Sequence, residues 1–200
     1  MSATKLPGRS PHRRRSAAGV FAVEFAIVVV VFFTVIFGVM ELARLMYVFN
    51  TLQEVTRRAA RAAANTDFTN ASGMDAVRQA AIFRSSAGEL ALGSPIRDSY
   101  VRIDYMALVL GVSGLTLTPI ASTALPASPA QNRLNCVSNP NGGSCISFVR
   151  VRICDPGDTS TCNPAGYVPI FPFINLVPTL PSSTTILRAE TLGYRPGNAL

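Results

Sequence analysis

The hydrophobic positions of this chain first form one unbroken apolar run near its start. Val20 to Met40 spans 21 residues and carries a single charge, Glu24. Because a hydrocarbon core of about 30 Å needs roughly 20 helical residues to cross it, the run predicts a transmembrane helix. A secretory signal peptide is the alternative, but its apolar core usually has only about 7–15 residues before a small-residue cleavage site. The chain instead continues into Met40-Glu41-Leu42 without such a site.

After the run, apolar residues recur at spacings of three or four, which is the pattern of one helix face. No Gly or Pro intervenes between Val39 and Ala64. Acidic residues precede basic ones by three or four positions, as Glu54 precedes Arg58, and such pairs support a helix. The pattern predicts one continuous helix over 20–64, about 65 Å long at roughly 1.5 Å per residue. Its apolar stripe outside the membrane consists of Leu42, Leu45, Phe49, Leu52, Val55 and Ala59.

Further along the chain, the pattern predicts a second helix and then strands. A short helix is expected over 72–86, with Ser72 as its N-cap and Gly88 as its stop. From residue 99 onward, apolar residues alternate with polar ones, which is typical of strands with one buried face. The strands are expected within 100–108, 144–154 and 183–193, with Pro-rich and polar loops at 119–129 and 132–144.

Together these elements predict an α+β fold. A long N-terminal transmembrane helix continues outside the membrane, a second short helix follows, and a small antiparallel β-sheet packs on the long helix. The chain is therefore expected to comprise a basic cytoplasmic leader (1–19), a transmembrane segment (20–40) and an extracytoplasmic domain (41–200). Within that domain, the helical part is 41–64 and the β-rich part is 99–200.

The charge of the chain is concentrated at its start. The formal net charge is +7, and five basic residues precede Gly19 with no acidic residue among them. Basic residues before a span predict that the N-terminus is cytoplasmic and that the domain after the span is outside. The sequence has no basic patch interleaved with aromatic residues, so nucleic acid is not an expected partner. The five residues are Lys5, Arg9, Arg13, Arg14 and Arg15.

The four cysteines, Cys136, Cys145, Cys154 and Cys162, all lie beyond the span. An even number of cysteines on the non-cytoplasmic side predicts two disulfides. Zinc is the competing interpretation, but spacings of nine, nine and eight lack the close pairs of zinc sites. Four cysteines allow three connectivities. We favour the sequential pairs Cys136–Cys145 and Cys154–Cys162, because turn-forming residues lie within each pair.

The start of the apolar run looks like a class III (prepilin-type) leader. Basic residues are followed by Gly19, and Glu24 and Phe25 come five and six residues after that glycine. Cleavage after Gly19 would make Val20 the first residue and Glu24 the fifth. Glycine fits a tight protease cleft because it has no side chain. A carboxylate inside an apolar span is costly and usually has a partner, for which the new α-amine of a neighbouring subunit is suited. Alternatively, Glu24 reaches the headgroups by itself from one turn inside the span.

The segment from Gly19 to Ala64 resembles the TadE family, whose TadE and TadF proteins are minor pilins or pseudopilins. The resemblance rests on Val23-Glu24-Phe25-Ala26, Phe37-Gly38, Glu41-Leu42-Ala43-Arg44 and Arg57-Arg58-Ala59-Ala60-Arg61-Ala62-Ala63-Ala64. Looser similarity continues at Tyr167, Pro169, Phe171-Pro172-Phe173 and Arg188-Ala189-Glu190, whereas residues 111–144 look like an insert relative to the family core.

This resemblance implies a minor subunit that acts in initiation or assembly of the tight-adherence (Flp, type IVc) pilus. It implies a position in the bacterial inner membrane, or in the pilus itself, with the C-terminal domain in the periplasm. The implied partners are a prepilin peptidase, other minor and major pilins, and the pilus assembly platform.

The sequence offers little for catalysis. His12 is the only histidine and lies in the leader, so the rest of the chain has no Ser-His or Cys-His pair. No phosphate-binding loop is present, and Asp155 and Asp158 supply too few oxygen ligands for calcium. We therefore expect no enzyme, cofactor or metal. The alternative function is an uncleaved, membrane-anchored periplasmic binding or adhesion protein, and only a pilin should begin at Val20.

Overall fold

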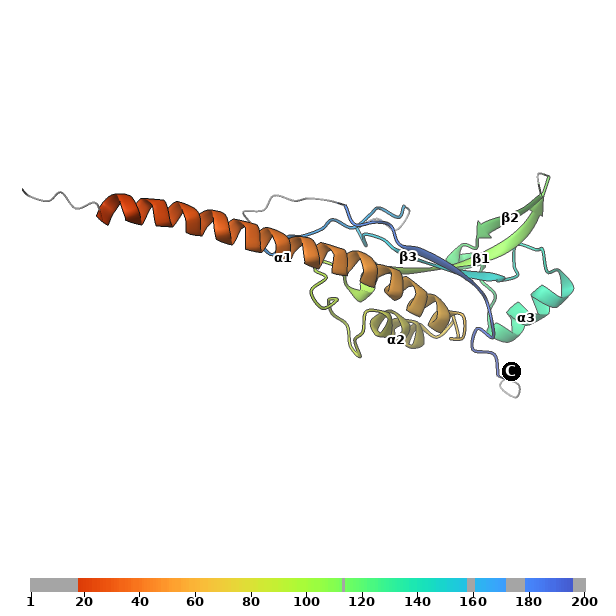
Figure 1. Cartoon of the computed structure of the whole chain (residues 1–200). Helices are drawn as coiled ribbons and strands as arrows, with labels where there is room; N and C mark the ends of the chain where they lie inside the picture. The colour runs from red at the N-terminus through yellow and green to blue at the C-terminus, as the bar shows by residue number, and fades with distance from the viewer. Residues whose placement is uncertain (1–17, 113, 158–160, 172–178, 196–200) are drawn as a thin grey trace, which may run out of the picture. The chain divides into compact units, whose positions relative to one another are not determined.

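A computed structural model describes residues 18–112, 114–157, 161–171 and 179–195 of the chain. Its first helix, α1, runs from Ala18 to Ala63 (Figure 1). The chain divides into two compact units between Met40 and Glu41, and each is described by itself. In the first unit, residues 19–40 are helical and none of them is buried. This stretch of α1 is apolar and long enough to cross a membrane, which suggests a single-pass anchor.

The described residues of the second unit form the rest of α1, two further α-helices and one sheet. The sheet is wholly antiparallel with the strand order β2-β1-β3-β4. The α+β fold is therefore confirmed. The helices are α2 (Ala71–Ala81) and α3 (Pro129–Ser138), with 3₁₀ turns at Asp98–Tyr100 and Ser122–Ala124. The strands are β1 (Val101–Gly111), β2 (Gly114–Pro119), β3 (Phe148–Ile153) and β4 (Thr184–Arg188).

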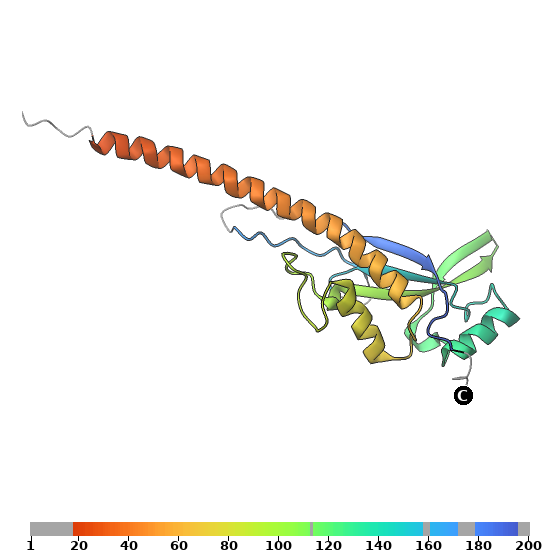
Figure 2. The same cartoon turned by 60° about the horizontal axis from the view of Figure 1, so that its bottom comes forward.

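One face of the sheet is covered by α2 and by the second half of α1 (Figure 2). The Tyr105 hydroxyl lies 3.5 Å from Met74 Sδ of α2, and the Thr185 hydroxyl lies 2.9 Å from that of Thr56 in α1. Tyr105 pairs with Val149, and Thr185 pairs with Val151 two residues further along β3, so both point to the same face. The buried core lies between this face and the helices. It includes Val48, Leu52, Val55, Ala59, Val101, Val149, Val151 and Ile153.

The second helix differs from its predicted bounds. It begins after Asn70, whose side chain accepts a 3.0 Å hydrogen bond from the Gly73 N–H, so Ser72 is not the N-cap. It ends at Ala81, five residues before the predicted end at 86. Phe83 adopts φ 62°, and the Phe83 and Arg84 N–H groups donate to the carbonyls of Ala80 and Gln79. This is a Schellman closure, in which a non-glycine residue takes the left-handed position.

Two elements lie where loops or an insert were predicted. Residues 129–138 form α3, with Ser128 accepting a hydrogen bond from the Gln131 N–H and Pro129 as the first helical residue. Residues 114–119 form β2, which pairs with the second half of β1. The predicted insert over 111–144 is therefore a hairpin strand and a helix. The remaining strands lie close to their predicted positions, although β3 and β4 are shorter at both ends.

The C-terminal segment closes the end of α1. The N–H groups of Glu190 and Leu192 both donate to the Ala64 carbonyl, at 3.3 and 3.0 Å. Gly193 follows with φ 79°, and a Cβ atom there would lie 2.5 Å from the Asp67 N atom. A glycine is required at this position by both the backbone conformation and the space.

Candidate functional site

The residues of the predicted leader motif lie at the start of α1. Val20 and Phe25 are 73% and 61% exposed. Glu24 is exposed as well, and its side chain makes no hydrogen bond or ion pair with any described residue. A Cβ atom built on Gly19 would meet nothing within 4 Å. The described part of the fold therefore gives no reason for a glycine at position 19, nor for an acid at position 24.

Helical geometry brings the parts of this motif onto two adjacent faces. Val20 and Glu24 are four residues apart, as are Phe21 and Phe25, and residues four apart lie one above the other on a helix. Glu24 therefore shares a face with the residue that cleavage would make the new N-terminus. The structure describes no residue before Ala18, so the basic part of the leader lies outside the described residues.

The four cysteines form the two sequential disulfides that the sequence analysis favoured. Cys136–Cys145 joins α3 to the segment before β3, and Cys154–Cys162 closes a loop directly after β3. In both pairs the Cα atoms are 4.8 Å apart, which lies within the usual range for disulfides. The described residues contain no group of three His, Cys, Asp or Glu side chains that could hold a metal ion.

The second unit begins with a buried polar cluster that comprises Glu41, Arg44 and Tyr167. Glu41 is 1% exposed and Arg44 is 9% exposed. Arg44 Nη1 lies 2.9 Å from Glu41 Oε1 and donates to the Tyr167 hydroxyl at the same distance. The Tyr167 hydroxyl in turn donates a short hydrogen bond to Glu41 Oε1, and the Arg44 guanidinium stacks on the Tyr167 ring, 4.8 Å from its centroid. The three side chains therefore satisfy one another away from water.

The same cluster holds two distant loops by their backbones. Arg44 donates from Nε to the Leu92 carbonyl at 2.7 Å and from Nη1 to the Val168 carbonyl at 2.9 Å. The Ile170 N–H donates to the Glu41 carboxylate at 3.3 Å. Each of these backbone partners lies at least 48 residues away in sequence from the α1 residue that it contacts. One turn of α1 therefore holds two loops that are distant in sequence.

Hydrogen bonds in this cluster oppose the effect of burial on Glu41. Burial alone raises the pKa of the Glu41 carboxyl, but hydrogen bonds from Tyr167, Arg44 and the Ile170 N–H, together with the Arg44 charge, hold that pKa below its ordinary value. Burial, and then the hydrogen bond to Glu41, raise the pKa of Tyr167 to about 12. Glu41 is therefore an ionised, buried carboxylate, and Tyr167 is its neutral donor.

Glu41 and Arg44 were predicted only as parts of a helical motif, and their burial was not predicted. A signal was available. Glu41 precedes Leu45 by four residues and Val48 by seven, so it continues the apolar stripe of α1 toward the membrane. Charged residues on a buried stripe must be paired, because an unpaired buried charge is very costly.

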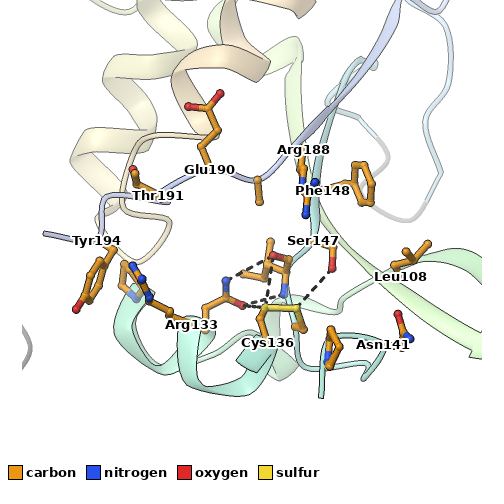
Figure 3. Close-up of a pocket in the computed structure, with 16 residues that line it drawn as sticks. Leu108, Arg133, Cys136, Asn141, Ser147, Phe148, Arg188, Glu190, Thr191 and Tyr194 are labelled. Atoms are coloured by element: carbon orange, nitrogen blue, oxygen red, sulfur yellow. Dashed lines mark hydrogen bonds between the residues drawn. A yellow bond between two sulfur atoms is a disulfide. The ribbon is translucent and has the colours of Figure 1, made fainter. Parts of the chain in front are cut away.

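A separate cavity of about 640 Å³ lies between α3, the sheet and the C-terminal segment. The Arg133 guanidinium lies on one side, 5.0 Å from the centroid of the Tyr194 ring. Leu108, Phe148 and Arg188 enter from the strands (Figure 3). The Cys136–Cys145 disulfide forms part of its floor. The lining combines apolar groups with the cationic Arg133 and Arg188, the acidic Glu190 and several neutral polar side chains.

The N-terminal helix resembles a known protein family. Residues 19–61 match the family model described as TadE-like protein. The chain carries a TadE-like segment. The predicted resemblance is thus confirmed over that segment, which contains Gly19, Glu24, Glu41 and Arg44. The match suggests a minor pilin-like protein associated with the tight-adherence pilus, a structural component for which enzymatic activity is not known. Searches of curated proteins and of solved structures find no match to the chain.

The TadE-like segment contains only part of the buried cluster. It supplies Glu41 and Arg44, whereas Tyr167 and the loops bound by Arg44 lie outside it. The segment therefore carries two distinct sets of polar residues. One set is exposed at the start of α1. The other set is buried in the second unit, where it holds two loops to the same helix.

Proposed function

We propose that this protein is a minor pilin, or pseudopilin, that acts in initiation or assembly of a tight-adherence (Flp, type IVc) pilus. The observation that carries the proposal is the TadE-like segment, which begins at Gly19 and whose first part, residues 19–40, is apolar with no buried residue. In this proposal, the N-terminus is cytoplasmic, residues 20–40 cross the inner membrane, and the disulfide-bonded domain over 41–200 is periplasmic.

A prepilin peptidase removes the leader by cleaving between Gly19 and Val20. Support comes from the open space around Gly19, which leaves the glycine without a role in packing. The exposed Glu24 and Phe25 then become pairing residues for neighbouring subunits. The partners are other minor pilins, the major pilin and the pilus assembly platform.

Replacing Gly19 by phenylalanine is expected to leave all of the protein as a precursor that keeps the 19-residue leader. A peptidase cleft that accepts glycine has no room for an aromatic side chain. The measurement is N-terminal sequencing and intact mass of the protein purified from membranes of the native host. The unsubstituted protein should begin at Val20.

Gly38→Phe is the matched control, because a Cβ atom at Gly38 also meets nothing within 4 Å and the residue lies in the same helix. This variant should be cleaved normally. If Gly19→Phe has the same mature mass as the unsubstituted protein, the prepilin processing is wrong. An uncleaved anchor for a binding or adhesion domain is then the better function.

A further inference from the structure

In the described part of the chain, neither edge strand of the four-stranded sheet has a further strand beside it. In β2, every residue from Leu115 to Pro119 is exposed, and in β4 the exposed residues are Thr184, Ile186 and Arg188. The chain has no charged residue between Asp104 and Arg133, so β2 lacks the charges with which edge strands usually prevent pairing. A groove of about 260 Å³ runs beside the start of β4, between Gln53 and Arg57 of α1 and residues 181–185.

The hydrogen bonds next to β2 and β4 show which backbone groups of these strands point away from the sheet. The Ile120 N–H donates to the Tyr105 carbonyl at 2.8 Å, which makes 105 and 120 a hydrogen-bonded pair of the β1–β2 ladder. Because such pairs alternate along an antiparallel ladder, Leu115 and Leu117 direct their N–H and C=O groups away from β1. Pro119 directs only a carbonyl outward, since proline has no N–H.

The same reasoning applies to β4. The Ala189 N–H donates to the Ser147 carbonyl at 2.9 Å, so odd-numbered residues of β4 bond to β3. Thr184, Ile186 and Arg188 therefore direct their N–H and C=O groups away from β3. On each edge, alternate residues have backbone groups without a partner among the described residues, and the side chains of these residues are exposed.

The two edges run in opposite directions. β1 is antiparallel to both β2 and β3, and β3 is antiparallel to β4, so β2 and β4 are antiparallel to each other. A second copy in the same orientation can therefore place its β2 beside β4 as the next antiparallel strand. Antiparallel pairing of two β2 edges would instead need a two-fold axis normal to the sheet. That axis would reverse the part of α1 that packs on the sheet, so the two copies would not share one orientation.

The side chains select a register for this contact. When Ile186 lies opposite Leu117 of the second copy, Arg188 lies opposite Leu115 and Thr184 opposite Pro119. Two complete pairs of backbone hydrogen bonds form, and the Thr184 N–H adds one to the Pro119 carbonyl. All these side chains lie on the sheet face away from α1. Ile186, Leu117 and Leu115 are 44%, 41% and 56% exposed in the single chain, and the contact covers them.

We propose that the sheet is an assembly surface on which β4 of one copy pairs with β2 of a second copy in this register. Copies joined in this way keep one orientation and form an open, head-to-tail series rather than a closed dimer. The groove beside β4 receives Thr118 of the second copy, which lies opposite Thr185 on the α1 side. This contact goes beyond the proposed pilin function and does not depend on cleavage at Gly19.

Oxidative cross-linking tests the contact directly. Full-length Leu117→Cys and Ile186→Cys proteins are mixed in detergent micelles and oxidised with copper phenanthroline. Opposed residues of a hydrogen-bonded antiparallel pair have Cα atoms about 5.5 Å apart, which suits a disulfide. We expect a cross-linked dimer in the mixture and none in either variant alone. Leu110→Cys mixed with Ile186→Cys is the matched control, because Leu110 is 64% exposed on the same face but lies in β1.

A second pair of variants separates the contact from random collision. Leu115→Cys mixed with Arg188→Cys should also give a cross-linked dimer. Adding Leu117→Lys to the Leu115→Cys protein should abolish this dimer, because the lysine would be buried against Ile186 of the other copy. Adding Leu110→Lys should leave it unchanged. The proposal is overturned if the first mixture gives no dimer or if the Leu110 control cross-links equally. It is also overturned if Leu117→Cys cross-links alone, which would indicate pairing of two β2 edges.

Discussion

Replacing Arg44 by methionine is expected to lower the free energy of unfolding of the second unit by about 3–5 kcal/mol. The guanidinium is 9% exposed and satisfies Glu41, Tyr167 and three backbone carbonyls, from Leu92, Ser94 and Val168. Removing it leaves the Glu41 carboxylate buried without its counter-charge, and the carbonyls lose their donor. Loss of one partner of a buried ion pair is far more costly than loss of the whole pair.

The measurement is urea unfolding of the full chain in detergent micelles, followed by tyrosine fluorescence. Arg97→Met is the matched control, because Arg97 also pairs with a glutamate, Glu89, but its side chain is 58% exposed. An exposed pair contributes roughly 0–1 kcal/mol, so the control should change stability little. A loss below about 1 kcal/mol in Arg44→Met would show that the cluster does not hold the unit together.

The stability of the unit should fall in acid because of Glu41. Its pKa in the folded state is below the ordinary value of 4.5, so the folded state binds a proton less readily than the unfolded state. The stabilisation is therefore fully present above about pH 4.5 and is lost as the pH falls through the folded-state pKa. Unfolding measured between neutral pH and pH 3 should show a shallower decline in Glu41→Gln. An equal slope in both proteins would remove Glu41 as a source of acid sensitivity.

Replacing Glu24 by glutamine or leucine is expected to abolish most pilus formation while leaving cleavage after Gly19 intact. A charge in an apolar span costs about 2.5–3.5 kcal/mol at the centre and less near the edge. A protein that needed only an anchor would gain nothing from this acid, which has no partner among the described residues. Within a bundle of subunits, the carboxylate and the α-amine of a neighbouring Val20 would satisfy each other. Their attraction is strengthened by the low dielectric.

The pair would also select one axial offset between subunits, since any other register leaves both charges exposed to lipid. The measurement is the number of pili per cell in strains that carry each variant, with the level of mature protein as the control. Glu54→Gln is a matched variant, because Glu54 is also an exposed acid on α1 but lies outside the predicted span. Normal piliation at a normal level of mature protein in both Glu24 variants would show that Glu24 does not pair with the α-amine of a neighbouring subunit.

Local sequence patterns were sufficient to predict elements with a continuous or one-sided apolar signal. The helix predicted over 20–64 is observed over Ala18–Ala63, and three strands lie where alternation predicted them. The elements that were missed have almost no buried face. Asn132 is the only buried residue of α3, and no residue of β2 is buried, so neither shows a clear apolar period. For α3, the Ser128-Pro129 start was the one available local signal.

The sequence by itself determined the apolar helix, the asymmetry of charge beside it, the leader motif and the TadE-like segment, because each is a property of neighbouring residues. Tertiary structure decided that Glu41 and Arg44 are buried and paired. Their partner Tyr167 is 126 and 123 residues away in sequence, and only folding brings it to the first turns of the second unit. The open edges of β2 and β4 were decided in the same way, because strand order depends on long-range pairing. No local pattern shows which backbone groups remain without a partner.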